Sequence, residues 1–143
     1  MFSVTYQNYI GMLLMKDPFK RLFQNMMMSG ARSQRAKASH RDAHYPIAVS
    51  IDDIRRKYDE QHGRCFWTGM PLRLADVFES YNMEMPSIDR LDPTQGYDYD
   101  NIVITSRFLN VGRGRMSPER TRQFLQRVLN LNAILHSPVE PPL

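Results

Sequence analysis

The sequence has 143 residues, a formal net charge of +4 and 42% apolar residues. This length suits one domain with a single core, and the longest strongly apolar stretch, residues 9–15, is far shorter than the roughly 20 residues of a membrane-spanning helix. The N-terminus lacks the pattern of a secretory signal, and the single cysteine, Cys65, excludes an internal disulfide and a multi-cysteine zinc site. We therefore expect a cytoplasmic protein with no membrane partner and no structural zinc.

The first expected helix begins near Pro18, a favourable residue for a first helical turn. Apolar side chains recur after it at helical spacing, and Gly30 is expected to end or loosen the helix. The segment 18–45 as a whole is expected to form a basic arm.

Basic residues gather in two segments that flank an acidic middle. Residues 18–41 have six Lys/Arg and no acid, and residues 105–122 have five arginines against a single Glu119. This distribution indicates a polyanion held by two arms and processed between them, although solvated helix faces have the same composition. The residues that we expect to bind nucleic acid are Lys20, Arg21, Arg32, Arg35, Lys37, Arg41, Arg107, Arg113 and Arg115.

A second helix is expected to begin at Ser50, because Ser50 and Asp53 have the spacing of a capping box. An apolar stripe at helical spacing supports this helix, and Gly63 is a natural end for it. Residues 64–72 follow as a compact turn rich in large apolar groups, and a loop extends from there to about Met85.

Two short strands joined by a turn come next. Residues 86–91 and 101–104 have the composition of strands, and residues 92–96 have that of a turn. A short helix is expected from Thr105 towards Asn110. Strand, turn, strand and helix together predict a ββα unit.

The last expected element is an amphipathic helix over residues 118–135. Residues 137–143 contain three prolines and are expected to be disordered. The predicted fold class is α+β, with a ββα core at residues 86–112 and flanking N-terminal, central and C-terminal helices. These elements form one domain, residues 18–136, after an N-terminal segment of residues 1–17.

Three polar residues of the ββα unit are candidates for chemistry: Asp89 on the first strand, Asn101 at the start of the second, and Asn110 on the helix. The spacing leaves room for a helical turn that folds back and brings Asn110 to Asp89. Carboxylate and amide oxygens are hard ligands that suit Mg²⁺ or Mn²⁺. The alternative is that these side chains bond their own backbone in turns, as Asp and Asn commonly do.

Short motifs follow one another along most of the chain, from about Lys20 to Asn130. In order, they are RAK at 35–37, IDDI at 51–54, GRC at 63–65, CFWTGMPL at 65–72, PSIDRLDPTQGY at 86–97, DNIVI at 100–104, and NVGRGR at 110–115. This series resembles the HNH (ββα-metal) endonucleases, in a subgroup common in phages. The core of that subgroup reads approximately S-I/L-D-R-x-D-x-x-x-G-Y-x-x-x-N.

The resemblance implies a role for each matching residue. Asp89 matches the strand aspartate that binds the metal, and Asn110 matches the helix residue that completes the protein's share of the ligands. Asn101 matches the central asparagine, which braces the loop and orients the catalytic residue. Arg113 and Arg115 lie where the family often places lysines or arginines, and are expected to meet phosphate.

Arg90 departs from the family, which has at this place the histidine that deprotonates the attacking water. Arginine stays protonated in proteins and cannot be that base, although it can neutralise a phosphate oxygen. Asp92 is the first candidate for the base, ahead of Tyr97 and Tyr99, whose pKa values would have to fall strongly. A metal-bound hydroxide with no protein base is also open. The expected catalytic residues are Asp89, Arg90, Asn101 and Asp92.

We therefore expect a divalent-metal-dependent endonuclease, with Mg²⁺, Mn²⁺ or another divalent ion, that hydrolyses DNA phosphodiester bonds by nicking. RNA stays open as a substrate, and the protein is expected to be a monomer or a weak homodimer. The alternative is an HNH-fold protein that has lost its chemistry through Arg90 and binds DNA or RNA as a structural part of a larger assembly.

Overall fold

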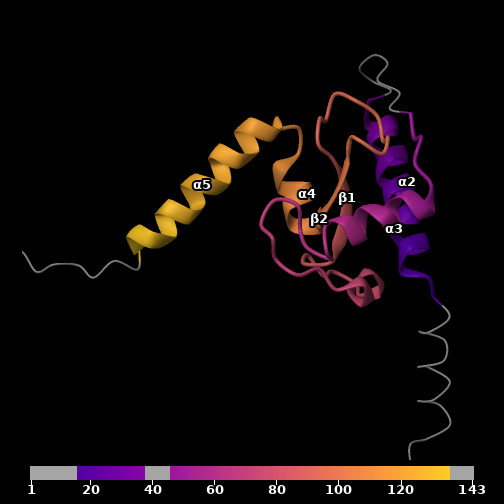
Figure 1. The fold of residues 1–143 in the computed structure, drawn as a ribbon. Coiled ribbons are helices and arrows are strands. Elements are labelled where there is room, and N and C mark those ends of the chain that lie inside the picture. The colour runs from indigo at the N-terminus through magenta and orange to yellow at the C-terminus, as the bar shows by residue number, and fades with distance from the viewer. Residues whose placement is uncertain (1–15, 38–45, 136–143) are drawn as a thin grey trace, which may run out of the picture.

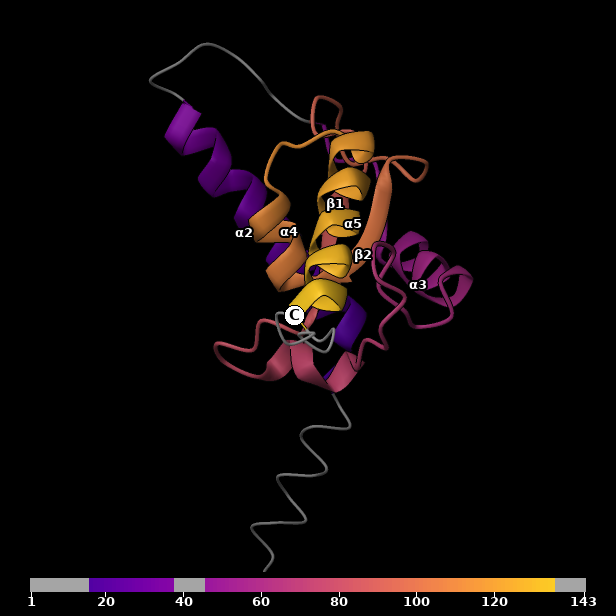
Figure 2. The same ribbon diagram turned by 90° about the vertical axis from the view of Figure 1, so that its left-hand side faces the viewer.

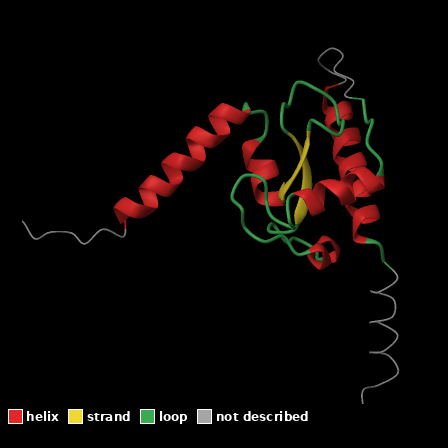
Figure 3. Cartoon of the chain, in the orientation of Figure 1, coloured by secondary structure: helices red, strands yellow, loops and turns green. Residues whose placement is uncertain are grey.

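The computed structural model describes residues 16–37 and 46–135, with side chains for 16–29 and 46–130. The described part mixes helices with one two-stranded sheet (Figure 1, Figure 3), which confirms the α+β class. The predictions for residues 1–15 and 137–143 lie outside it. The elements in chain order are α2 (Pro18–Lys37), α3 (Ile51–Glu60), the 3-10 helix η1 (Leu74–Phe78), β1 (Pro86–Arg90), β2 (Ile102–Ser106), α4 (Arg107–Arg113) and α5 (Pro118–Leu135).

Strands β1 and β2 form an antiparallel hairpin in which Ile88 lies opposite Ile104 and Asp89 lies opposite Val103. Successive side chains of a strand point to opposite faces, so the hairpin presents Ile88 on one face and Ser87 with Asp89 on the other. Helix α4 follows β2 directly and packs against both strands. The expected order of strand, strand and helix is therefore present.

The hydrophobic core lies on the Ile88 face of the hairpin. Helix α2 packs against β1, and α3 packs against β2, so both helices lie beside the hairpin in the two views (Figure 1, Figure 2). The side chains of Leu22, Ile54, Ile102 and Ile104 are almost completely buried there. Helix α4 covers the opposite face, where Asp89 lies.

Local signals explain most helix boundaries. Ser50 and Asp53 form the expected capping box at the start of α3, and Gly63 adopts a φ of 66° after its end, a conformation that glycine adopts without strain. The expectation that Gly30 ends the first helix was wrong, because α2 continues through it to Lys37. Among residues 16–37 and 46–135, no helix is long and apolar enough to span a membrane.

Helix α5 spans the range that the sequence predicts, and it projects away from the hairpin (Figure 1). Its first turn is anchored, because Thr121 is 2% exposed and its hydroxyl accepts a hydrogen bond from Arg113. Farther along α5 the apolar side chains of Phe124, Val128 and Leu129 are exposed.

Candidate functional site

Asp89 lies in the middle of β1, on the face that α4 covers, and is 6% exposed. Its Oδ1 accepts a hydrogen bond of 2.8 Å from the backbone N–H of Arg90. Its Oδ2 lies 2.8 Å from Nη1 of Arg113, in an ion pair whose side chains are 7% and 1% exposed. Both carboxylate oxygens therefore have a partner within the protein.

The Arg113 guanidinium is held by four oxygen atoms. In addition to Asp89, Nη1 donates to the backbone oxygen of Arg90 at 2.7 Å and Nη2 donates to that of Leu91. Nε donates to the hydroxyl of Thr121 at 3.0 Å. One buried cation thus ties β1, α4 and the first turn of α5 together.

The indole of Trp67 covers this ion pair. The guanidinium of Arg113 lies 5.0 Å from the Trp67 ring centroid, and that of Arg122 lies 5.8 Å from it, within the range of a cation–π contact. The buried Trp67 Nε1 makes no hydrogen bond of normal geometry, although it lies near enough to Asp89 to favour the charged carboxylate. No motif in the sequence signalled the contact of Trp67 with Arg113.

Burial dominates the titration of Asp89. It raises the pKa of the carboxyl above its ordinary value, while Arg113 and the Arg90 N–H offset only part of the effect. A buried carboxylate is stable only when it is paired. Arg113 is therefore the group that keeps a negative charge tolerable at this position.

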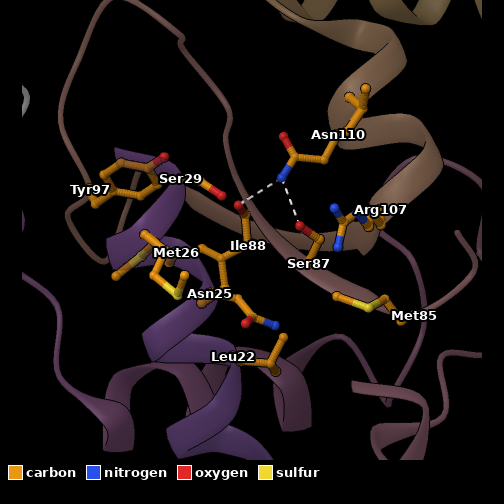
Figure 4. A pocket seen from close by; sticks show the side chains of 12 residues that line it. Leu22, Asn25, Met26, Ser29, Met85, Ser87, Ile88, Tyr97, Arg107 and Asn110 are labelled. Atoms are coloured by element: carbon orange, nitrogen blue, oxygen red, sulfur yellow. Dashed lines mark hydrogen bonds between the residues drawn. The ribbon is translucent and has the colours of Figure 1, made fainter. Parts of the chain in front are cut away.

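Asn110 lies one helical turn before Arg113 and contacts a different part of β1. Its Nδ2 donates to Ser87 Oγ at 2.8 Å and to the backbone oxygen of Ile88 at 3.0 Å (Figure 4). No hydrogen bond joins Asn110 to Asp89 in the described part of the chain. The residue of α4 that meets Asp89 is Arg113, which the sequence had assigned to phosphate.

Asn101 has the bracing geometry that the resemblance implies. Its Oδ1 accepts from the backbone N–H of Asp92 at 2.8 Å, and its Nδ2 donates to the oxygens of Gly96 and Asp92 at 2.8 and 3.1 Å. The side chain is 6% exposed. One amide thus closes the loop between the strands at both ends.

The side chains of Arg90, the last residue of β1, and of Asp92 contact that loop, whereas the backbone of Arg90 contacts Asp89 and Arg113. Strand alternation places the Arg90 side chain on the face opposite Asp89, where Nη1 donates to the backbone oxygen of Gln95 at 2.9 Å. The Asp92 carboxylate accepts from the N–H and hydroxyl of Thr94 at 2.8 and 2.6 Å and from Gln95 at 2.9 Å. These bonds, those of Thr94 foremost, lower the pKa of Asp92, which makes it a weak base.

The tyrosines beside the loop are no better suited to be a base. Burial raises the pKa of Tyr97, and the hydrogen bond of Tyr99 to Glu60 raises the pKa of Tyr99. Both phenols therefore stay protonated at neutral pH. Of the histidines, His62 lies at the end of α3, and His40, His44 and His136 lie outside the described residues.

The residues expected to bind nucleic acid fall into three groups. Lys20, Arg21, Arg107 and Arg115 are exposed, whereas Arg113 is 3% exposed and its donors are used internally. For the others no side-chain position is described: Arg32, Arg35 and Lys37 lie at the end of α2, and Arg41 lies outside the described residues.

A cavity of about 340 Å³ opens between α2, β1 and α4. Asn110, Ser87 and Arg107 line one side, and Asn25 with Tyr97 line the other (Figure 4). Asp89 is not part of its wall. Helix α4 thus places Arg107 and Asn110 at the open cavity and Arg113 in the buried ion pair.

The residues around Asp89 do not offer enough free oxygen ligands for a divalent ion in this arrangement. Mg²⁺ requires several oxygen ligands in an octahedral shell. Arg113 already donates hydrogen bonds to Asp89 Oδ2 and to the backbone oxygens of Arg90 and Leu91. The Asn110 amide bonds to Ser87 instead of approaching Asp89. Residues 16–37 and 46–135 contain no group of three or more His, Cys, Asp or Glu side chains that could hold a metal. The expected metal site at Asp89 and Asn110 stays a prediction.

A scan of protein-family models and a search of curated proteins found no match to this chain.

Proposed function

We propose that this chain is a nucleic-acid-binding module with an HNH-type core, in which Arg113 holds the place that the family gives to a divalent ion. The ion pair between Asp89 and Arg113 carries this proposal. Removing one partner of a buried pair costs about 3–5 kcal/mol, because the remaining charge is left desolvated and alone. A metal at Asp89 would have to displace Arg113 from the carboxylate.

The distribution of charge supports nucleic acid as the partner. Three basic residues of α3, namely Arg55, Arg56 and Lys57, pair with nearby acids. The exposed Lys20, Arg21, Arg107 and Arg115 take part in no ion pair within the described residues. Unpaired cations on a chain with a net charge of +4 attract a polyanion and contribute phosphate contacts that do not depend on base sequence.

Fluorescence anisotropy with labelled DNA duplexes of unrelated sequence tests the proposal. We expect binding at low salt that weakens as salt rises, and we expect EDTA to leave the affinity unchanged because Arg113 replaces the ion. Loss of binding on addition of EDTA would contradict the second expectation. Absence of binding to duplex DNA, single-stranded DNA and RNA at low salt would contradict the proposal as a whole.

Hydrolysis of DNA phosphodiester bonds with a divalent ion is the second candidate function. The observation that favours it is the bracing of the loop by Asn101, next to a buried aspartate on β1, as the HNH resemblance implies. It requires Arg113 to leave Asp89, so it demands a different arrangement of α4. A plasmid-nicking assay with Mg²⁺ or Mn²⁺, compared with EDTA and with Asp89→Asn, distinguishes the two functions: metal-dependent nicking that Asp89→Asn abolishes would establish hydrolysis.

A further inference from the structure

The cavity between α2, β1 and α4 has a mostly neutral lining. None of the twelve side chains that line it is acidic, and its single charged group is Arg107. Arg107 is exposed and forms no ion pair or side-chain hydrogen bond within the described residues. Its five N–H donors are therefore available to an anion.

Neutral polar groups surround the rest of the cavity. The Oδ1 of Asn110 accepts no hydrogen bond in the described part of the chain, because only Nδ2 is used, on Ser87 and Ile88. Asn25 on the facing side makes no side-chain hydrogen bond there either. Two amides on opposite walls can thus donate to and accept from a polar, planar group between them.

Apolar surface completes the lining. Met26, Met28, Met85 and Ile88 also line the cavity, and the Tyr97 ring lies at its edge (Figure 4). Methionine and tyrosine side chains give favourable contacts to flat aromatic groups. One cation, two amides and an apolar bed match a phosphate joined to a heterocyclic base.

We propose that this cavity binds a single nucleotide, with its phosphate on Arg107 and its base between Asn25 and Asn110. The volume of about 340 Å³ lies at the lower end of small-molecule sites, which begin near 300 Å³, so it admits one nucleotide and no duplex. The nucleotide is either a free nucleoside monophosphate or an unpaired nucleotide of a strand. This inference rests on the proposed nucleic-acid function and adds to it a site that recognises one nucleotide.

Isothermal titration of the full chain with deoxynucleoside 5′-monophosphates tests the site. We expect the monophosphates to bind more tightly than inorganic phosphate or the deoxynucleosides, because each of those supplies only half of the contacts. Arg107→Gln should weaken nucleotide binding about tenfold, because it removes a charge-assisted contact. Arg127→Gln, which makes the same charge change at an exposed arginine of α5 outside the cavity, should leave it within about twofold.

A second pair of variants tests the cavity without changing charge. Val111 lines the cavity and is 65% exposed, whereas Val128 lies on α5 and is 47% exposed. Val111→Trp should block nucleotide binding, and Val128→Trp should not. The proposal would be overturned if Val111→Trp and Val128→Trp had equal effects on nucleotide binding, or if Arg107→Gln and Arg127→Gln had equal effects.

Two further measurements separate the possible outcomes. Competition of a single-stranded oligonucleotide with the bound monophosphate shows that the nucleotide of a strand enters the cavity, and lack of competition shows a site for the free nucleotide. Duplex binding, measured on the same samples, separates this inference from the proposed function. A wild type that binds duplex DNA but no nucleotide overturns only the cavity site, and one that binds neither overturns both.

Discussion

Arg107 and Arg113 lie at the two ends of α4, and the protein uses them in different ways. Arg113 is 3% exposed and donates to Asp89, two backbone oxygens and Thr121. Arg107 is exposed beside an open cavity and has no such partners among the described residues. Position on a single short helix thus decides whether an arginine stabilises the fold or is available to a ligand.

Asn110 and Asp89 also belong to different parts of the contact between α4 and β1. One turn of α4 lies over Ser87 and holds Asn110, and the next lies over Asp89 and holds Arg113. A metal shared by Asp89 and Asn110 requires an oxygen of each side chain to face the same point. We therefore predict a structural ion pair in one place and a binding site in the other.

The largest expected effect is that of Arg113→Met on stability. The change leaves the Asp89 carboxylate buried and unpaired, and should lower the free energy of unfolding by about 3–5 kcal/mol, measured by urea denaturation. Arg115→Met, at an exposed arginine, should change it by less than about 0.5 kcal/mol. A decrease below about 1 kcal/mol for Arg113→Met would show that the pair is not a stabilising contact.

The stability of Arg113→Met should also depend on pH. Burial raises the pKa of Asp89 and Arg113 lowers it, so removing Arg113 raises this pKa further. The folded variant then binds a proton more tightly than the unfolded chain, and its stability falls as pH rises through the pKa of folded Asp89. The double variant Asp89→Leu with Arg113→Met has no buried charge, so it should regain part of the stability and show little of the pH dependence.

A smaller effect is expected for Asn101→Ala. This change removes three hydrogen bonds to the loop between the strands and leaves the Asp92 N–H without its partner, which should cost about 2–3 kcal/mol. Thermal or urea unfolding measures it. Asp100→Ala, at the exposed neighbour, is the matched control, and similar destabilisation by the two variants would contradict a bracing role for Asn101.

Substitution of the exposed basic residues of α2 should weaken nucleic-acid binding without changing stability. Replacing Lys20 and Arg21 with Gln should flatten the plot of log affinity against log salt by about 0.9 for each phosphate of duplex DNA that the variant no longer neutralises. The matched control replaces Arg55 and Arg56, which pair with acids of the protein. An unchanged slope in the first double variant would show that α2 presents only a solvated face.

The smallest expected effect is that of Arg90→His on cleavage. This change restores the residue that the HNH resemblance expects, but strand alternation places it on the face opposite Asp89. We therefore expect no gain of metal-dependent plasmid nicking. A gain that rises with pH in the range of a histidine pKa would show that position 90 reaches the reacting groups.

Much of the fold follows from local signals in the sequence. The capping box at Ser50 and the strand pattern on either side of the loop depend on residues close in the chain, and so does the helix at 118–135. The bracing role of Asn101 came from the resemblance, and the structure has its hydrogen bonds. Gly30 was misjudged because one glycine in a long helix costs only about 1 kcal/mol, which the packing of α2 on β1 outweighs.

The candidate site was less predictable, because it depends on how α4 lies against β1. Sequence spacing allows either Asn110 or Arg113 to reach Asp89, and both lie on nearly the same face of a helix. Packing of α4 and the anchoring of Thr121 decide in favour of Arg113. The available signal was Arg113, three residues after the expected ligand Asn110. A basic residue in a basic segment, however, is more simply assigned to phosphate.

Titration with Mn²⁺, followed by NMR, tests most directly whether Arg113 holds the place of a metal. A paramagnetic ion bound at Asp89 would broaden the amide signals of Asp89, Arg90 and Leu91 before others. We predict no such selective broadening in the wild type at stoichiometric Mn²⁺. Selective broadening of these signals that Asp89→Asn removes would contradict the proposed role of Arg113, and would restore the divalent-metal site as the better description.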